Sequence, residues 1–127
     1  MHHFPVQAVA WEGEPAVTTE GQPLDKLERT IADRAANPRE KSYTSQLLAG
    51  GVAKIGAKLV EETAEVVEAA GEPGDPGREH FVREVGDLLY HLMVMLRLKD
   101  VSLADVEAEL ARRFGVSGIE EKESRKK

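Results

Sequence analysis

Two segments of this chain combine acidic residues with an apolar face, and a loop rich in glycine and proline joins them. The acidic residues form the motifs Glu61-Glu62-x-x-Glu65 and Glu84-x-x-Asp87. Helical residues turn by about 100° each, so the acids of each segment share one helix face. The loop over 71–77 holds three glycines and two prolines and cannot continue a helix for long. The sequence therefore predicts an antiparallel helical hairpin, with helices over about 52–70 and 78–99.

The register of this hairpin predicts a metal site. Residues equally far from the loop lie side by side, which places Glu65 opposite Glu84 and Glu62 opposite Asp87 if both acidic faces point inward. Converging carboxylates repel one another unless a cation lies between them, and an all-oxygen ligand set suits Mg²⁺, with Mn²⁺ as the alternative. The predicted metal ligands are Glu61, Glu62, Glu65, Glu84 and Asp87. Bound magnesium accepts phosphate oxygens, so the predicted substrate is a polyphosphate.

A solvated surface is the alternative interpretation of these acids, because acid-rich helix faces are commonly exposed to water. Apolar residues form separate stripes, namely Leu59, Thr63, Val66 and Ala70 on the first helix and Val85, Leu89, Leu92 and Leu96 on the second. The position of Glu84 and Asp87 across the loop from the first motif favours the metal site.

Two further residues fall in the same register. Lys58 lies opposite His91, and Lys54 follows one turn away on the same face. A lysine beside acids forms a weak surface ion pair or, in a phosphate site, contacts phosphate oxygens. His91 has two interpretations, a contact to substrate and a hydrogen-bonded residue of the core.

Composition excludes several classes of protein. The formal net charge is −6, which argues against general nucleic-acid binding but not against a small phosphorylated ligand held by a metal. No apolar run approaches the ~20 residues of a membrane span. The chain has no cysteine for disulfides or thiolate sites, which fits a cytoplasmic protein.

Helical periodicity runs through the rest of the domain, so we expect an all-α fold, a compact bundle of about five helices around the central hairpin. A first helix over about 24–36 ends at Asn37-Pro38. A short helix begins at an N-cap formed by Ser42 or Thr44 and ends at Gly50-Gly51. A last helix over about 103–114 opens with the capping box Ser102-x-x-Asp105 and ends at Gly115.

The domain is expected to span 23–115 and to associate with itself. Residues 1–22 form an irregular arm, either loose or held by Phe4 and Trp11, and 116–127 form a polar tail. Apolar residues such as Val94 and Leu98 exceed what one hairpin can cover. We therefore expect a homodimer or a higher homo-oligomer, with the site near the subunit boundary.

Three motifs resemble those of the phosphoribosyl-ATP pyrophosphohydrolase family, within the all-α NTP pyrophosphatase (MazG-like) superfamily. They are Ser42-Tyr43-Thr44-x-x-Leu47-Leu48, Lys54-Ile55-x-x-Lys58-x-x-Glu61-Glu62-x-x-Glu65 and Glu84-x-x-Asp87-Leu88-Leu89-Tyr90-His91-Leu92. The similarity covers about 24–113, and the arm over 1–22 has no counterpart. The resemblance implies Mg²⁺-dependent hydrolysis of the α–β phosphoanhydride of phosphoribosyl-ATP, the second step of histidine biosynthesis, which yields phosphoribosyl-AMP and pyrophosphate.

Site roles follow as hypotheses. Glu62 is the candidate general base, and Lys58 with Lys54 would balance charge on the leaving pyrophosphate. The other candidate substrate-binding residues are Arg39, Lys41, Ser42, Tyr43, Thr44 and His91. Arg39 and Lys41 would hold the ribose phosphate, and Tyr43 is either a substrate contact or a packing residue. The competing functions are a house-cleaning nucleoside triphosphate pyrophosphatase and a non-catalytic acidic dimerisation module.

Overall fold

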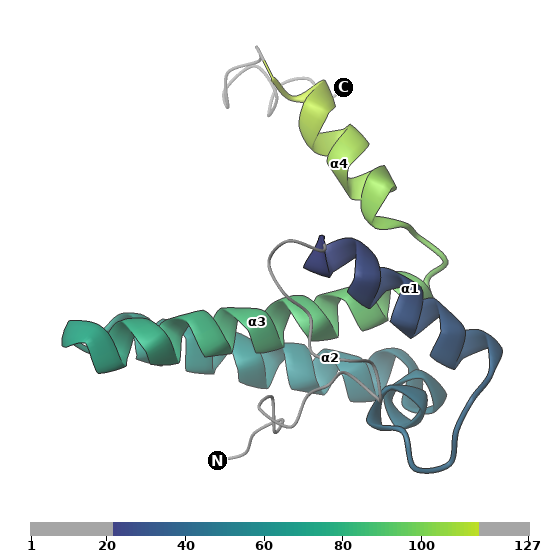
Figure 1. The fold of residues 1–127 in the computed structure, drawn as a ribbon, viewed down its shortest axis with the longest axis horizontal. Coiled ribbons are helices and arrows are strands. Elements are labelled where there is room, and N and C mark those ends of the chain that lie inside the picture. The colour runs from purple at the N-terminus through teal and green to yellow at the C-terminus, as the bar shows by residue number, and fades with distance from the viewer. Residues whose placement is uncertain (1–21, 115–127) are drawn as a thin grey trace.

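The computed structural model describes residues 22–114, and within that range it contains four α-helices and no strand. The helices are α1 (Pro23–Ala36), α2 (Tyr43–Ala70), α3 (Gly74–Leu98) and α4 (Leu103–Arg112). α2 and α3 lie side by side as a long antiparallel hairpin, α1 packs across one end of it, and α4 projects away (Figure 1). The prediction of an all-α fold around a central hairpin is confirmed. Gly115, the tail and, apart from Gln22, the arm lie outside the described residues.

The expectation of about five helices is wrong, because the short helix and the first helix of the hairpin form one element, α2. The predicted boundary is still visible as a bend. Gly51 has φ 72° and ψ −163°, a conformation that is essentially restricted to glycine. In Figure 1 the first turns of α2 are seen nearly end-on, whereas the rest of α2 runs along α3.

Local side-chain chemistry sets the ends of the helices. Ser42 is the N-cap of α2, since its hydroxyl accepts a hydrogen bond from the Ser45 amide at 3.0 Å. The predicted capping box of α4 is present, with bonds of 3.0 Å in both directions between Ser102 and Asp105. α3 begins at Gly74, earlier than predicted, because Pro76 lies in its first turn, where proline lacks no required donor.

The hydrophobic core lies where α1, the first half of α2 and the second half of α3 meet. Its buried members are Leu27, Ile31, Leu47, Ile55, Tyr90, Met93 and Val94. α1 contributes through Leu27 and Ile31, which are four residues apart and therefore share one helix face. This small core fixes one end of the hairpin and leaves the end near the turn without a covering element among the described helices.

The inward face of the hairpin carries acids, whereas much of its apolar surface points outward. Glu62, Glu84 and Asp87 are buried, but Leu89 and Leu92 of the predicted apolar stripes are exposed. α4 has no buried residue at all, although Leu103 packs against the edge of the core. No helix within 22–114 combines the length and the apolar character that crossing a bilayer requires.

Candidate metal and substrate site

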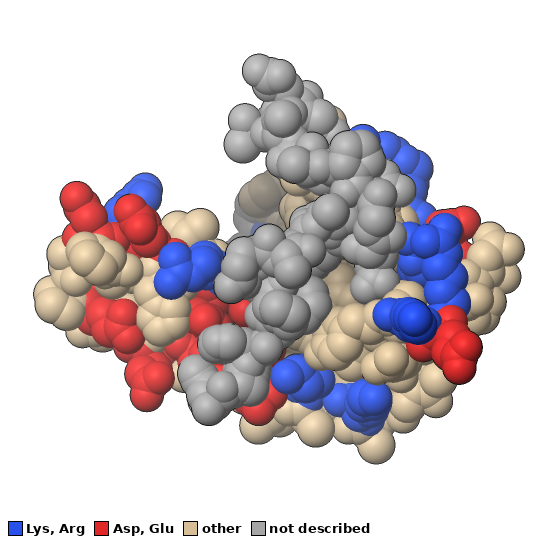
Figure 2. All heavy atoms as spheres, turned by 60° about the horizontal axis from the view of Figure 1, so that its bottom comes forward, with Lys and Arg blue, Asp and Glu red and all other residues tan. Residues whose placement is uncertain are grey.

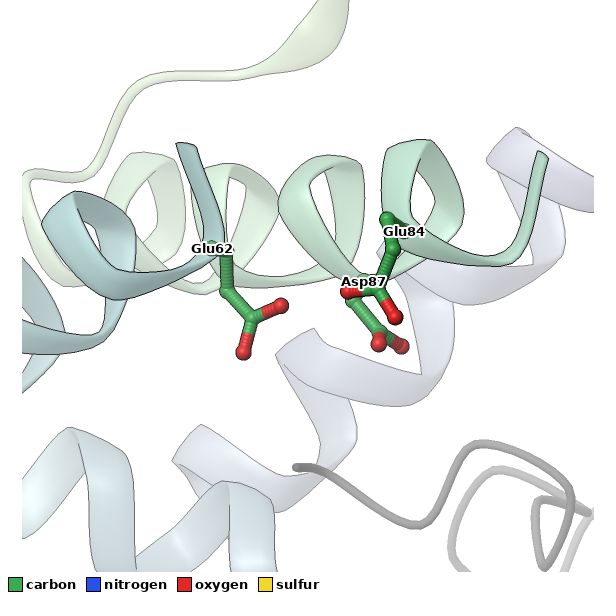
Figure 3. A group of neighbouring side chains, drawn as sticks. All are labelled: Glu62, Glu84 and Asp87. Carbon is green, nitrogen blue, oxygen red and sulfur yellow. The ribbon is translucent and has the colours of Figure 1, made fainter. Parts of the chain in front are cut away.

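Three buried carboxylates meet on the inner face of the hairpin. Glu62 comes from α2, and Glu84 and Asp87 come from α3. Each offers an oxygen, and these three oxygens lie within 4.8 Å of one another. The residues are 0%, 3% and 2% exposed, and their carboxylates project to the same side of the hairpin (Figure 3). This carboxylate cluster contains three of the five acids that the register of the two motifs was expected to bring together.

The electrostatics of the carboxylate cluster favour a bound cation. Burial, followed by repulsion from Glu65, raises the pKa of Glu62 from 4.5 to about 7. Burial and then Glu62 raise the pKa of Asp87 from 3.8 to about 7. Within the described residues, Glu84 Oε1 and Asp87 Oδ1 are buried without a hydrogen-bond partner. Buried carboxylate oxygens without donors are the ligands that a hard divalent ion accepts, so the cluster fits such an ion.

The other two predicted metal ligands occupy different positions. Glu65 is half-buried beside the cluster, and its charge raises the pKa values of both Glu62 and Asp87. Glu61 is exposed and accepts a 2.7 Å hydrogen bond from the Lys58 ammonium. The structure therefore brings three acids together, keeps a fourth alongside, and leaves Glu61 at the rim.

The Lys58 ammonium pairs with acids of α2, the helix to which it belongs. Its Nζ lies 3.9 Å from Glu62 Oε2, so a positive charge borders the carboxylate cluster. Lys58 also lowers the pKa of His91 by its charge, after the larger effect of burial, which shows that the two residues are near each other. Lys54 is exposed one turn away, and its side chain packs over Gly50.

His91 is fully buried and connects α2 to the cluster. Its Nδ1 lies 2.8 Å from the carbonyl oxygen of Asp87, which can only accept, so Nδ1 carries the proton. Burial lowers the pKa of His91, so the ring is neutral and its Nε2 accepts from the Tyr43 hydroxyl at 3.0 Å. Burial and the charge of Glu62 raise the pKa of Tyr43 to about 12, which keeps this donor protonated. His91 therefore holds Tyr43 in place against α3.

The predicted substrate-binding residues before and at the start of α2 are divided between the core and a cavity at the surface. Thr44 is buried and its hydroxyl hydrogen-bonds to the hydroxyl of Tyr90, which places it in the core. Arg39 and Lys41 are exposed residues of the loop, and with Ser42 and Arg34 they line a cavity of about 190 Å³. We call this cavity, lined by Arg34, Arg39, Lys41 and Ser42, the basic pocket. On the face in Figure 2, basic side chains gather mainly over the end where α1 meets α2, and acidic ones over the end with the hairpin turn.

Comparison with known proteins places the chain in a family. Residues 24–114 match the family model of phosphoribosyl-ATP pyrophosphohydrolase. The chain belongs to the phosphoribosyl-ATP pyrophosphohydrolase family. A phosphoribosyl-ATP pyrophosphatase of Rhodopirellula baltica is 50% identical over 103 residues, which is 81% of this chain and 86% of the relative. One from Novosphingobium aromaticivorans is 51% identical over 105 residues, 83% of this chain and 95% of the relative.

Two residues that lie beside the candidate sites, Arg34 and His80, were not identified from the sequence. Arg34 follows Leu27 and Ile31 on the buried face of α1, so its helical spacing was the available signal. His80 precedes Glu84 by one turn, with its Nε2 3.2 Å from Glu84 Oε2 and its Nδ1 2.9 Å from Glu72 Oε1. The hydrogen bond to Glu72 and the charges of both acids raise the pKa of His80, which favours its protonated form beside the carboxylate cluster.

Proposed function

We propose that this protein hydrolyses the α–β phosphoanhydride of phosphoribosyl-ATP, giving phosphoribosyl-AMP and pyrophosphate in the cytoplasmic pathway of histidine biosynthesis. The observation that carries the proposal is the buried carboxylate cluster, which lies within the region that matches the family. The relatives from Rhodopirellula baltica and Novosphingobium aromaticivorans are phosphoribosyl-ATP pyrophosphatases and support this choice of substrate.

Glu62, Glu84 and Asp87 would hold Mg²⁺ or Mn²⁺, with Glu65 beside them and Glu61 at the rim. When bound, such an ion neutralises phosphate charge and makes a water more acidic. The protein supplies the oxygen ligands, and the burial of these side chains shields the site from bulk water. His80, within 3.2 Å of Glu84, limits the freedom of that carboxylate.

Glu62 remains the candidate general base, as a buried carboxylate of the cluster. Its pKa of about 7 describes the metal-free protein, and a bound cation would lower that value by favouring the ionised carboxylate. Lys58, whose ammonium is 3.9 Å from Glu62, would balance negative charge as pyrophosphate departs. Lys54 lies one turn further and would extend this positive charge along α2. Tyr43, fixed by His91, presents a hydroxyl from the first turn of α2 toward the same region.

Release of pyrophosphate from phosphoribosyl-ATP, with and without added Mg²⁺, tests this proposal. The Asp87→Asn variant should lose at least 10²-fold in turnover while its helical content by circular dichroism stays unchanged, since it removes one buried ligand. Asp75→Asn removes the same charge at an exposed position of α3 and should retain activity. Near-normal turnover by Asp87→Asn would remove that residue from the site.

Two other outcomes would replace the proposed function. Faster hydrolysis of dUTP or another nucleoside triphosphate than of phosphoribosyl-ATP would indicate a house-cleaning pyrophosphatase. Titration calorimetry that detects no saturable Mg²⁺ or Mn²⁺ binding would indicate a non-catalytic helical module.

We further propose a homodimer formed through the outer face of the hairpin. Val60, which is 74% exposed, and Val67 lie on the face of α2 opposite Glu62, and Leu89 and Leu92 are likewise exposed on α3. An apolar surface of this kind needs a cover, and a second copy offers the same face in return. Light scattering should give twice the chain mass, and Val60→Glu should shift it toward the monomer. A monomeric wild-type protein at micromolar concentration would contradict the dimer.

A further inference from the structure

The basic pocket carries three positive side chains and no acid among its lining residues. Arg34 comes from α1, Arg39 and Lys41 come from the connecting loop, and Ser42 is the N-cap of α2. Two segments of the chain thus bring like charges to one cavity of about 190 Å³. Cations placed together repel one another unless an anion binds between them, so the pocket is suited to an anionic group.

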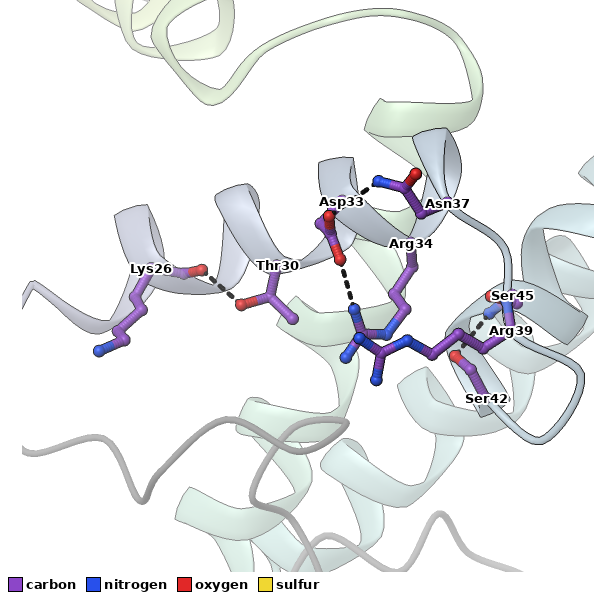
Figure 4. Close-up of polar contacts among 8 residues, drawn as sticks. All are labelled: Lys26, Thr30, Asp33, Arg34, Asn37, Arg39, Ser42 and Ser45. Carbon is purple, nitrogen blue, oxygen red and sulfur yellow. Dashed lines mark hydrogen bonds and ion pairs between the residues drawn. The ribbon is translucent and has the colours of Figure 1, made fainter.

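Arg34 is the unusual member of the basic pocket, because it is only 3% exposed. Charged side chains are seldom buried without a partner, and its Nη1 pairs with Asp33 Oδ2 at 2.6 Å. Asp33 also accepts a 3.0 Å hydrogen bond from the Asn37 amide, so the carboxylate that orients Arg34 is itself held. A guanidinium has five N–H donors in a fixed plane and can bind a second oxyanion while it keeps this pair. Figure 4 shows the side chains of Arg34 and Arg39 extending toward the same region.

The loop that carries Arg39 is also fixed. The Arg39 amide donates to Ser45 Oγ at 3.0 Å, and the Ser42 amide donates to the Arg39 carbonyl at 3.1 Å. Ser42 in turn caps α2, whose N-terminal end carries the positive pole of the helix dipole. The basic pocket is therefore built before a ligand arrives, which lowers the entropy cost of binding an anion.

The basic pocket is one residue away from the chain of contacts that leads to the carboxylate cluster. Ser42 lines the pocket, and the next residue, Tyr43, hydrogen-bonds His91, which hydrogen-bonds the backbone of Asp87. A single extended ligand with anionic groups at both ends can thus contact both places. Phosphoribosyl-ATP has this form, with a triphosphate at one end and a phosphomonoester on the second ribose at the other.

We propose that the basic pocket binds the phosphomonoester of the phosphoribosyl group, with Arg34 as its buried anchor, and that it thereby selects phosphoribosyl-ATP over ATP. This inference rests on the proposed function. Arg–phosphate pairs are bidentate and charge-assisted, which gives this one contact enough free energy to separate the two nucleotides.

Steady-state kinetics of two variants test the pocket. Arg39→Ala, at an exposed position, and Arg34→Lys, which keeps the charge but loses the planar fork, should each raise KM for phosphoribosyl-ATP at least fivefold. The value of kcat should change less than threefold, because the reacting phosphates lie elsewhere, and the preference for phosphoribosyl-ATP over ATP should fall. The control is Arg29→Ala, which removes an exposed arginine of α1 outside the pocket and should leave KM within twofold.

Ribose 5-phosphate provides a second readout on the wild-type protein. It should compete with phosphoribosyl-ATP, whereas ribose should not, and Arg39→Ala should weaken the inhibition by ribose 5-phosphate. An unchanged KM in Arg39→Ala, or equal inhibition by ribose, would overturn the assignment even if Arg34→Lys fails to fold. A wild-type protein that does not release pyrophosphate from phosphoribosyl-ATP would reject the proposed function itself, whereas an active enzyme with an unmoved KM rejects the pocket alone.

Discussion

Replacing Glu62 by Gln should stabilise the metal-free protein and abolish its activity. Glu62 is fully buried among other acids, and its pKa is raised from 4.5 to about 7. A carboxyl group with a higher pKa in the folded state binds its proton more tightly when folded. Its contribution to stability is therefore greatest below about pH 4.5, declines as the pH rises toward 7, and stays low above that.

The pKa values give the size of the effect. Raising the pKa of Glu62 from 4.5 to about 7 corresponds to about 3 kcal/mol of unfavourable free energy for the ionised folded form. A buried amide has its own desolvation cost of about 1 kcal/mol. The net gain for Glu62→Gln at pH 8 is therefore about 2 kcal/mol, which raises Tm by about 10 °C for a domain of this size. At pH 5 the wild-type carboxyl is protonated in the folded state, so the two proteins should differ little.

Thermal denaturation followed by circular dichroism, at pH 5 and pH 8 with EDTA, measures this difference. Added Mg²⁺ should stabilise the wild-type protein at pH 8 and reverse the order of the two Tm values, because the variant lacks one of the proposed ligands. The control Glu61→Gln alters an exposed neighbour and should change stability by less than about 0.5 kcal/mol. A Glu62→Gln variant that is no more stable than wild type at pH 8 in EDTA, or a gain that is the same at both pH values, would refute the reasoning.

Four further substitutions test the fold. Gly51→Ala should lower the free energy of unfolding in urea by about 1–3 kcal/mol, because the backbone conformation of Gly51 is strained for any residue with a side chain. Gly56→Ala, inside the regular helix, should raise this free energy by about 0.5–1 kcal/mol. Equal effects of the two substitutions would contradict the bend. Ser102→Ala should cost α4 about 1 kcal/mol and speed amide exchange in that helix, and unchanged exchange would argue against the capping box. Tyr43→Phe removes the hydrogen bond to His91 and should lower the free energy of unfolding by about 1 kcal/mol, and an unchanged value would contradict a stabilising role for this bond.

Local chemistry made much of the fold predictable. The N-cap of α2, the capping box at Ser102 and the stop at Asn37 depend on residues within one turn. The structure has all three, and of the two N-cap candidates it uses Ser42 rather than Thr44. The placement of Glu62 near Glu84 and Asp87 followed from equal distances to one short turn. Each of these predictions used an interaction that is local in sequence or that one hairpin fixes.

Other features depend on what the chain packs against, and periodicity cannot supply that. The stripe with Leu89 and Leu92 was as apolar as a core face, yet the single chain turns it outward. Arg34 has the spacing of a core residue and the chemistry of a surface one, and only its contact with Asp33 shows how burial is tolerated. The early start of α3 was missed because Pro76 was treated as a helix breaker, although the first turn accepts proline.

The bend at Gly51 divides α2 into two helical segments that carry different parts of the site. The short segment before the bend carries Tyr43 and follows its N-cap Ser42, and the long segment after the bend carries Glu62. The angle between these segments depends on two backbone torsions of a residue that has no side chain. A rotation about the Gly51 torsions would change the distance between Ser42 and Glu62 without altering either residue. To make this protein accept a longer or shorter nucleotide, the bend at Gly51 should therefore be changed before any residue that contacts the ligand.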